Sequence, residues 1–117
     1  DMQHHRKNRT LSRTRRARTA LLRGLAIDLV KNGKIVTTEA KAKELRPFVE
    51  RLITHAKKDS VAARRLIATN LGEPSSEVVQ TFFAAAQAYA DRPGGYTRII
   101  KMGPTPAGRR EATIELV

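Results

Sequence analysis

The strongest hydrophobic repeat in the sequence lies between residues 40 and 57, and it restricts the fold more than any other feature. Apolar side chains recur there at the spacing of one helix face: Leu45, Phe48, Val49, Leu52, Ile53 and Ala56. Such a stripe is stable only when other elements cover it, so the chain must build a core around this helix. Pro47 lies inside the repeat, and we expect a short helical turn, a break near Arg46 and then the main helix.

Similar spacing predicts three further helices. A first helix over about residues 14–31 has apolar positions three and four residues apart and stops at Asn32-Gly33. A third helix over about residues 60–69 follows a capping serine, and we expect three of its side chains to face inward: Val61, Leu66 and Ile67. A fourth helix follows the serines at 75–76 and runs to about Ala90.

The remaining patterned segments are strands. Lys34–Thr38 is short and rich in β-branched residues, and Thr38 can also cap the helix that follows. Residues 96–102 are rich in strand-forming residues, and apolar and polar residues alternate over 112–116. The Gly and Pro residues of 103–108 predict a turn between these two segments, which should therefore form a hairpin. A lone strand cannot satisfy its own backbone, so Lys34–Thr38 should pair with the hairpin in an α+β fold whose helices cover one sheet face.

The length of 117 residues has room for one domain. Of these residues 40% are hydrophobic and only 4% aromatic, which predicts a small aliphatic core. Residues 1–13 show no hydrophobic repeat, and we expect them to form a basic extension that is disordered or extended in the free protein. Residues 14–117 are then expected to form a single globular domain.

The positive charge is concentrated at the start of the chain. The formal net charge is +12, and residues 2–24 contain no acid but eight cations: Arg6, Lys7, Arg9, Arg13, Arg15, Arg16, Arg18 and Arg23. Solubility would be served by scattered charge of either sign, whereas this concentration is best balanced by a polyanion. Arginine suits bidentate contact with phosphate, so we interpret these eight residues as nucleic-acid contacts.

Other classes of function lack support in the sequence. There is no Cys, and His4, His5 and His55 have no partners at metal-ligand spacing, so we expect no metal and no cofactor. No nucleophile elbow or phosphate-binding loop occurs, which argues against an enzyme and a small-molecule substrate. No apolar run reaches the length of a membrane span, and we expect a soluble, unexported protein.

Charge alone leaves the kind of polyanion open. An arginine-rich arm that orders on binding is typical of RNA partners, but nucleoid-type DNA-binding proteins carry such arms too. A cationic membrane-active protein is a third alternative, for which the helix over residues 14–31 comes closest. Its leucines are more simply explained by packing on the body of the protein.

Short motifs distributed over the chain resemble the bacterial large-subunit ribosomal protein seventeen family. They are Thr37-Thr38 followed by Lys41–Arg46, the run Gly94–Ile99, the run Ala63–Leu66, the ending Ile114–Val117, and Met2, His4, Arg9, Leu11 and Arg13 in the basic opening. Their order along essentially the whole chain makes the set specific. Four positions depart from the usual pattern of the family: Gln3, Asn8, Ser12 and Ala17.

The resemblance implies a two-layer body of about four helices on a small mixed sheet, with the basic extension reaching into large-subunit ribosomal RNA. It implies an architectural role in the ribosome beside neighbouring large-subunit proteins, with no membrane and no chemistry of its own. On the matching motifs, RNA contacts of the body are expected at Lys41, Lys43, Arg64, Arg65, Tyr96 and Arg98. For Arg98 the alternative is an ion pair with Glu111 or Glu115.

Overall fold

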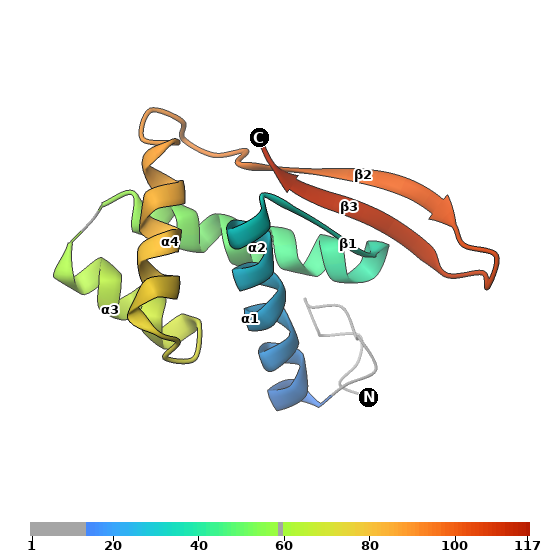
Figure 1. The fold of residues 1–117 in the computed structure, drawn as a ribbon, viewed down its shortest axis with the longest axis horizontal. Coiled ribbons are helices and arrows are strands. Elements are labelled where there is room, and N and C mark those ends of the chain that lie inside the picture. The colour runs from blue at the N-terminus through green and yellow to red at the C-terminus, as the bar shows by residue number, and fades with distance from the viewer. Residues whose placement is uncertain (1–13, 59) are drawn as a thin grey trace, which may run out of the picture.

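The computed structural model describes residues 14–58 and 60–117 (Figure 1). The predicted extension, residues 1–13, lies outside the described residues. The described part contains four helices and three strands in the order α1 (Arg15–Asn32), β1 (Lys34–Thr38), α2 (Glu39–Ala56), α3 (Val61–Asn70), α4 (Ser76–Gln87), β2 (Thr97–Pro104) and β3 (Arg110–Leu116). The predicted α+β class is confirmed, although α4 ends three residues before the expected Ala90 and a turn follows it.

The sheet has the order β1-β3-β2, so the hairpin strand β3 lies in the centre and β1 completes the sheet, as predicted. Both pairings are antiparallel, which corrects the mixed sheet that the resemblance implied. Ile114 lies opposite Ile35 on one side and Ile99 on the other, and this apolar row faces the helices. The helices all lie on one side of the sheet in Figure 1, with α2 running beneath it.

Helix α2 is the centre of the core, in contact with the other three helices and with all three strands. Its apolar stripe is buried except for Phe48, which is partly buried, and Leu29 and Val30 from α1 and Phe82 and Phe83 from α4 are buried with it. This burial is the main stabilising contribution, because each large apolar side chain removed from water contributes about 1.5–3 kcal/mol.

Helix α2 runs unbroken through Pro47, so the predicted break near Arg46 is wrong. An interior proline removes one backbone hydrogen bond and costs about 3 kcal/mol in a helix. Here the proline is exposed, and buried residues flank it on both sides, from Ala42 and Leu45 to Val49 and Leu52. Both halves pack on the same core, and that packing outweighs the local cost.

The predicted caps at Thr38 and Ser60 are confirmed, and Thr14, which was not predicted, caps α1 in the same way. Ser75 stands at the N-cap of α4 as expected, but its side chain makes no cap hydrogen bond. Thr14, Thr38 and Ser60 each accept a hydrogen bond from the backbone N–H three residues later, at 3.2, 3.3 and 3.0 Å. Gly33 ends α1 with a φ of 82°, a left-handed conformation that glycine adopts without strain.

The predicted inward face of α3 is only partly right. Ile67 is fully buried, but Val61 and Leu66 are exposed, and the buried partner of Ile67 is Ala63, one turn earlier. Ala63 and Ile67 lie one turn apart, so they mark the face on which α3 packs against α2 and α4.

Candidate nucleic-acid interface

The first turn of α1 presents two unpaired arginines. Arg15 and Arg16 are both exposed, and no carboxylate among the described residues pairs with either of them. The first turn of α1 contains no acidic residue. The positive end of the helix dipole therefore lies beside two cations, which is unfavourable unless an anion binds there. Arg6, Lys7, Arg9 and Arg13, predicted to bind RNA, lie outside the described residues.

Arg18 belongs to the packed side of α1 rather than to its outer face. It precedes Leu22 by one helical turn, and its guanidinium donates a hydrogen bond to Glu44 of α2. The two side chains are 17% and 8% exposed. This pair fastens the N-terminal half of α1 to α2, so the direction in which the chain enters α1 depends on it.

Glu44→Gln should lower the free energy of unfolding by about 2 kcal/mol, because the largely buried guanidinium of Arg18 would lose its anionic partner. This loss of stability is smaller than for a fully buried pair, because Arg18 keeps some contact with water. Urea unfolding measures it. The matched control is Glu111→Gln, whose carboxylate pairs with the exposed Arg109 and should cost less than about 0.5 kcal/mol. Equal effects of the two substitutions would show that the Arg18–Glu44 pair has no special role.

Arg23 also has a structural contact. Its Nε donates to the backbone carbonyl of Asn70 at 3.0 Å, which ties α1 to the end of α3. The side chain lies against Gly72, where an added Cβ would come within 3.3 Å of it and where φ is +81°. Glycine at this position therefore provides both the turn and the space for Arg23.

The four predicted cations on α2 and α3 lie in different environments. Lys41 is half-buried, and Lys43 lies 3.9 Å from Glu39 one turn earlier in α2. Arg64 reaches across to α4, where its guanidinium lies 4.7 Å from the centre of the Phe83 ring. Arg65 is exposed, and no carboxylate among the described residues pairs with it. These side chains do not converge on one point.

Tyr96 is buried, so its ring has no surface to offer RNA, and its assignment as an RNA contact is corrected. Its hydroxyl shares a 3.0 Å hydrogen bond with Thr54 and accepts one of 3.0 Å from Lys57. Lys57 also donates to the carbonyl of Arg92. Burial acts to raise the pKa of Tyr96, but these hydrogen bonds and the Lys57 charge outweigh it and lower the pKa. The cluster fastens the segment before β2 to the end of α2.

Arg98 forms the ion pair that the sequence left open as an alternative to an RNA contact. Its Nε donates to Glu115 at 3.0 Å, and its terminal nitrogen contacts the same carboxylate oxygen. The two residues are opposite each other in the register of β2 and β3. Its charge is therefore partly neutralised before any partner binds.

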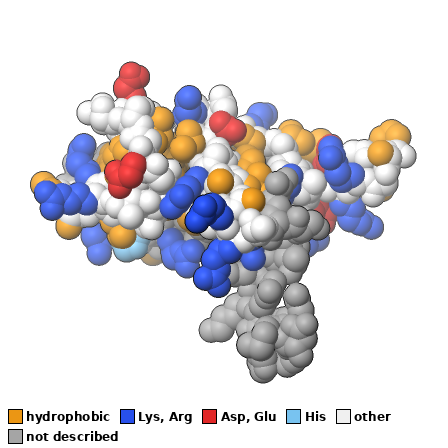
Figure 2. Space-filling view, turned by 90° about the horizontal axis from the view of Figure 1, so that it is seen from below, with side chains coloured by type: hydrophobic (Ala, Val, Ile, Leu, Met, Phe, Trp, Pro, Cys, Tyr) orange, Lys and Arg blue, Asp and Glu red, His pale blue; other side chains and the backbone are white. Residues whose placement is uncertain are grey.

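Sequence reasoning did not single out several other exposed cations. They are Arg51, Lys101, Arg109 and Arg110. No spacing or motif separates them from ordinary solvated charges, so only the three-dimensional arrangement could reveal them. Figure 2 shows Lys and Arg side chains spread along one face of the molecule, with fewer acids among them. The cationic surface is broad rather than a single cleft.

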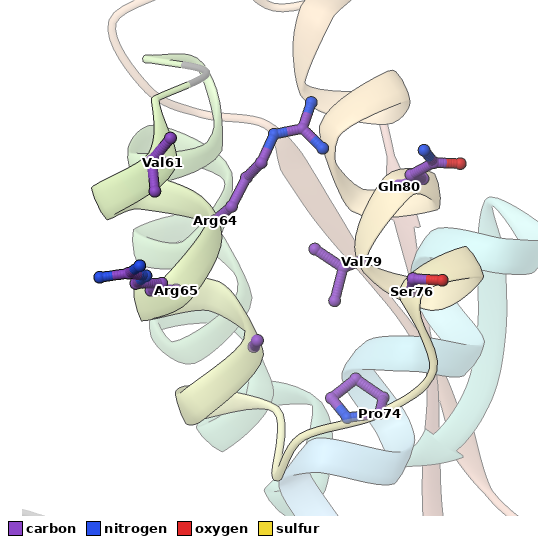
Figure 3. Close-up of a pocket in the computed structure, with 8 residues that line it drawn as sticks. Val61, Arg64, Arg65, Pro74, Ser76, Val79 and Gln80 are labelled. Atoms are coloured by element: carbon purple, nitrogen blue, oxygen red, sulfur yellow. The ribbon is translucent and has the colours of Figure 1, made fainter.

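A groove of about 390 Å³ lies between α3 and the start of α4 (Figure 3). Its lining is largely apolar: Val79 points into it, Arg64 extends across one end, and Arg65 points away. A catalytic pocket needs convergent polar groups, and this groove has none among its labelled residues. Over residues 14–58 and 60–117 no cluster of three His, Asp or Glu side chains could hold a metal ion. None of the helices in those ranges has the length and apolar character needed to cross a membrane.

Comparison with known proteins assigns the chain to a family. The family model for ribosomal protein L17 matches residues 21–117. The large ribosomal subunit protein bL17 of Gemmatimonas aurantiaca is 49% identical over 117 residues, covering 99% of this chain and 98% of that protein. The bL17 proteins of an Exiguobacterium species and of Persephonella marina are 50% and 44% identical, covering 92% and 99% of this chain and 96% and 95% of their own lengths. The chain belongs to the ribosomal protein L17 family.

Proposed function

We propose that this chain is a structural constituent of the large ribosomal subunit that binds ribosomal RNA through its basic N-terminal extension and the outer start of α1. It carries out no reaction and needs no cofactor. Its place is in the cytoplasmic ribosome, beside other large-subunit proteins. The observation that carries the proposal is the acid-free run of eight cations in residues 2–24, which includes the exposed Arg15 and Arg16 at the start of α1.

The proposed mechanism is neutralisation of phosphates. The N-terminal end of α1 combines a positive helix dipole with two arginines, and an RNA phosphate there would remove the unfavourable charge. Lys41 and Arg65 supply further contacts from the body. Arg18 and Arg23 support this surface by fixing α1 on α2 and α3, rather than by meeting the RNA themselves.

Replacing both Arg15 and Arg16 by Gln should weaken binding to a large-subunit RNA fragment and reduce the slope of log K against log salt by about 2, one for each lost phosphate contact. Filter binding at several salt concentrations measures both quantities. Arg98→Gln is the matched control, because the Arg98 charge is already paired with Glu115. A loss with Arg98→Gln equal to that of the double variant would contradict the assignment of the interface to α1.

A nucleoid-type DNA-binding protein is the alternative that net charge alone would allow. A competition at matched salt between the RNA fragment and duplex DNA of equal length separates the two. We expect the RNA to be preferred, because irregular RNA offers grooves and splayed phosphates that an arginine-rich arm can follow. Equal affinity for both would favour the alternative.

A further inference from the structure

The face of the sheet that points away from the helices carries an exposed apolar strip. Val36, Ile100 and Met102 are 59%, 45% and 55% exposed. The register places Val36 of β1 and Ile100 of β2 on either side of Thr113 in β3, and the Thr113 hydroxyl donates to Met102 Sδ at 3.2 Å. Because side chains alternate along a strand, these four residues share the outer face while Ile35, Ile99 and Ile114 face the core. The strip therefore crosses all three strands.

The chemistry of this face favours a protein over RNA. The same alternation places Glu111 and Glu115 of β3 on the outer face, where they neutralise Arg109 and Arg98, so this face offers phosphates little net positive charge. None of its strand residues is aromatic, so the face has no ring on which a base could stack. An aliphatic centre with charged residues at its ends is instead the composition of a protein–protein contact.

The charge at one end of the strip indicates what the partner supplies. Lys34 lies opposite Glu115 in the register, but that carboxylate is bonded to Arg98. Lys34 is exposed, and no carboxylate of the described residues lies within ion-pair distance of it. A carboxylate from the partner would complement this lysine. A second copy of the chain fits poorly, because two molecules of net charge +12 repel each other.

We propose that the outer sheet face, defined by Val36, Ile100, Met102 and Thr113, docks a neighbouring protein of the large subunit. The partner presents a row of aliphatic side chains to the strip and a carboxylate to Lys34. This inference rests on the proposed function, since the partner is a neighbour in the assembled subunit. It adds a protein contact on the opposite side of the sheet from the helices.

The first test is the double variant Val36→Thr, Ile100→Thr, carried into large subunits in place of the wild-type chain. Threonine keeps the β-branched shape, so the unfolding midpoint should stay close to that of the wild type. The subunits are then washed in about 1 M salt, which screens phosphate contacts but not apolar ones. The retained fraction should fall severalfold for the double variant and stay at the wild-type level for Val61→Thr, a control at an exposed valine of α3. Equal retention of the three proteins would overturn the proposal.

Binding to the naked RNA fragment separates this inference from the proposed function. The double variant should bind that RNA with wild-type affinity. Weaker RNA binding by the double variant alone would make the face an RNA surface and would overturn the docking proposal. Failure of the wild-type chain to bind the RNA would instead contradict the proposed function.

A crosslink identifies the class of partner directly. A photoreactive phenylalanine analogue at position 100 in purified large subunits should give one major protein adduct that survives ribonuclease. Lys34→Glu should reduce the yield of that adduct, whereas Lys34→Arg should preserve it. An adduct that ribonuclease destroys, or the absence of any adduct, would contradict the proposal.

Discussion

Raising the salt concentration from about 50 mM to about 200 mM should lower the affinity of this chain for a large-subunit RNA fragment by a factor of about 10³ or more. The reason is counterion release: each phosphate that a Lys or Arg neutralises frees a condensed cation, and added salt opposes that release. The size of the effect assumes that at least six phosphates are contacted. The acid-free run before residue 25 contains eight cations, of which Arg18 and Arg23 have contacts within the protein, leaving six for RNA.

The measurement is a filter-binding titration at four or more salt concentrations. Sucrose is the control, since it changes the osmotic conditions without screening charge, and it should leave the affinity nearly unchanged. An affinity that varies less than about tenfold over the salt range would mean that few phosphates are engaged, and the electrostatic mechanism would then be wrong.

Tyr96→Ala should destabilise the fold by about 3–5 kcal/mol, as expected for truncation of a fully buried aromatic side chain. Tyr96→Phe keeps the ring but leaves Thr54 and Lys57 without their shared partner, and it should cost about 1–2 kcal/mol. Urea unfolding measures both. Tyr89→Phe is the matched control, because Tyr89 is also buried but none of the hydrogen bonds found among the described residues involves its hydroxyl.

Tyr96→Phe also decides whether this tyrosine meets RNA. The variant should bind the RNA fragment with wild-type affinity, because the ring and hydroxyl face the interior. A stable Tyr96→Phe protein with weakened RNA binding would show that the tyrosine leaves the core to contact RNA, contrary to the structure. A Tyr96→Phe protein as stable as the wild type would show that the hydroxyl does not stabilise the fold.

Much of the fold could be predicted from local patterns. The amphipathic repeat of α2, the alternation in β3 and the caps at Thr38 and Ser60 are all properties of short segments. The break at Pro47 was wrongly predicted because its cost is local, whereas the packing that compensates for it comes from other elements. The exposure of Val61 has a similar origin, since the inward face of a short helix depends on its neighbours.

The binding surface was less predictable than the fold. Composition and charge distribution located the cationic part of the chain, but they could not show which arginines pair within the protein. Arg18 stands one turn before Leu22, and this spacing was the available signal that it lies on the packed side. The burial of Tyr96 depends on residues 39 to 42 positions away, so no local pattern could reveal it. The ion pair of Arg98 required the register of the hairpin.

Sedimentation of the chain with large ribosomal subunits tests the central claim most directly. A tagged copy, expressed in a bacterium whose own L17-family protein has been deleted, is followed through a sucrose gradient at low salt. The account predicts that the chain migrates with the large subunit and with whole ribosomes at about one copy per particle. A chain that stays at the top of the gradient, while large subunits assemble without it, would contradict the account.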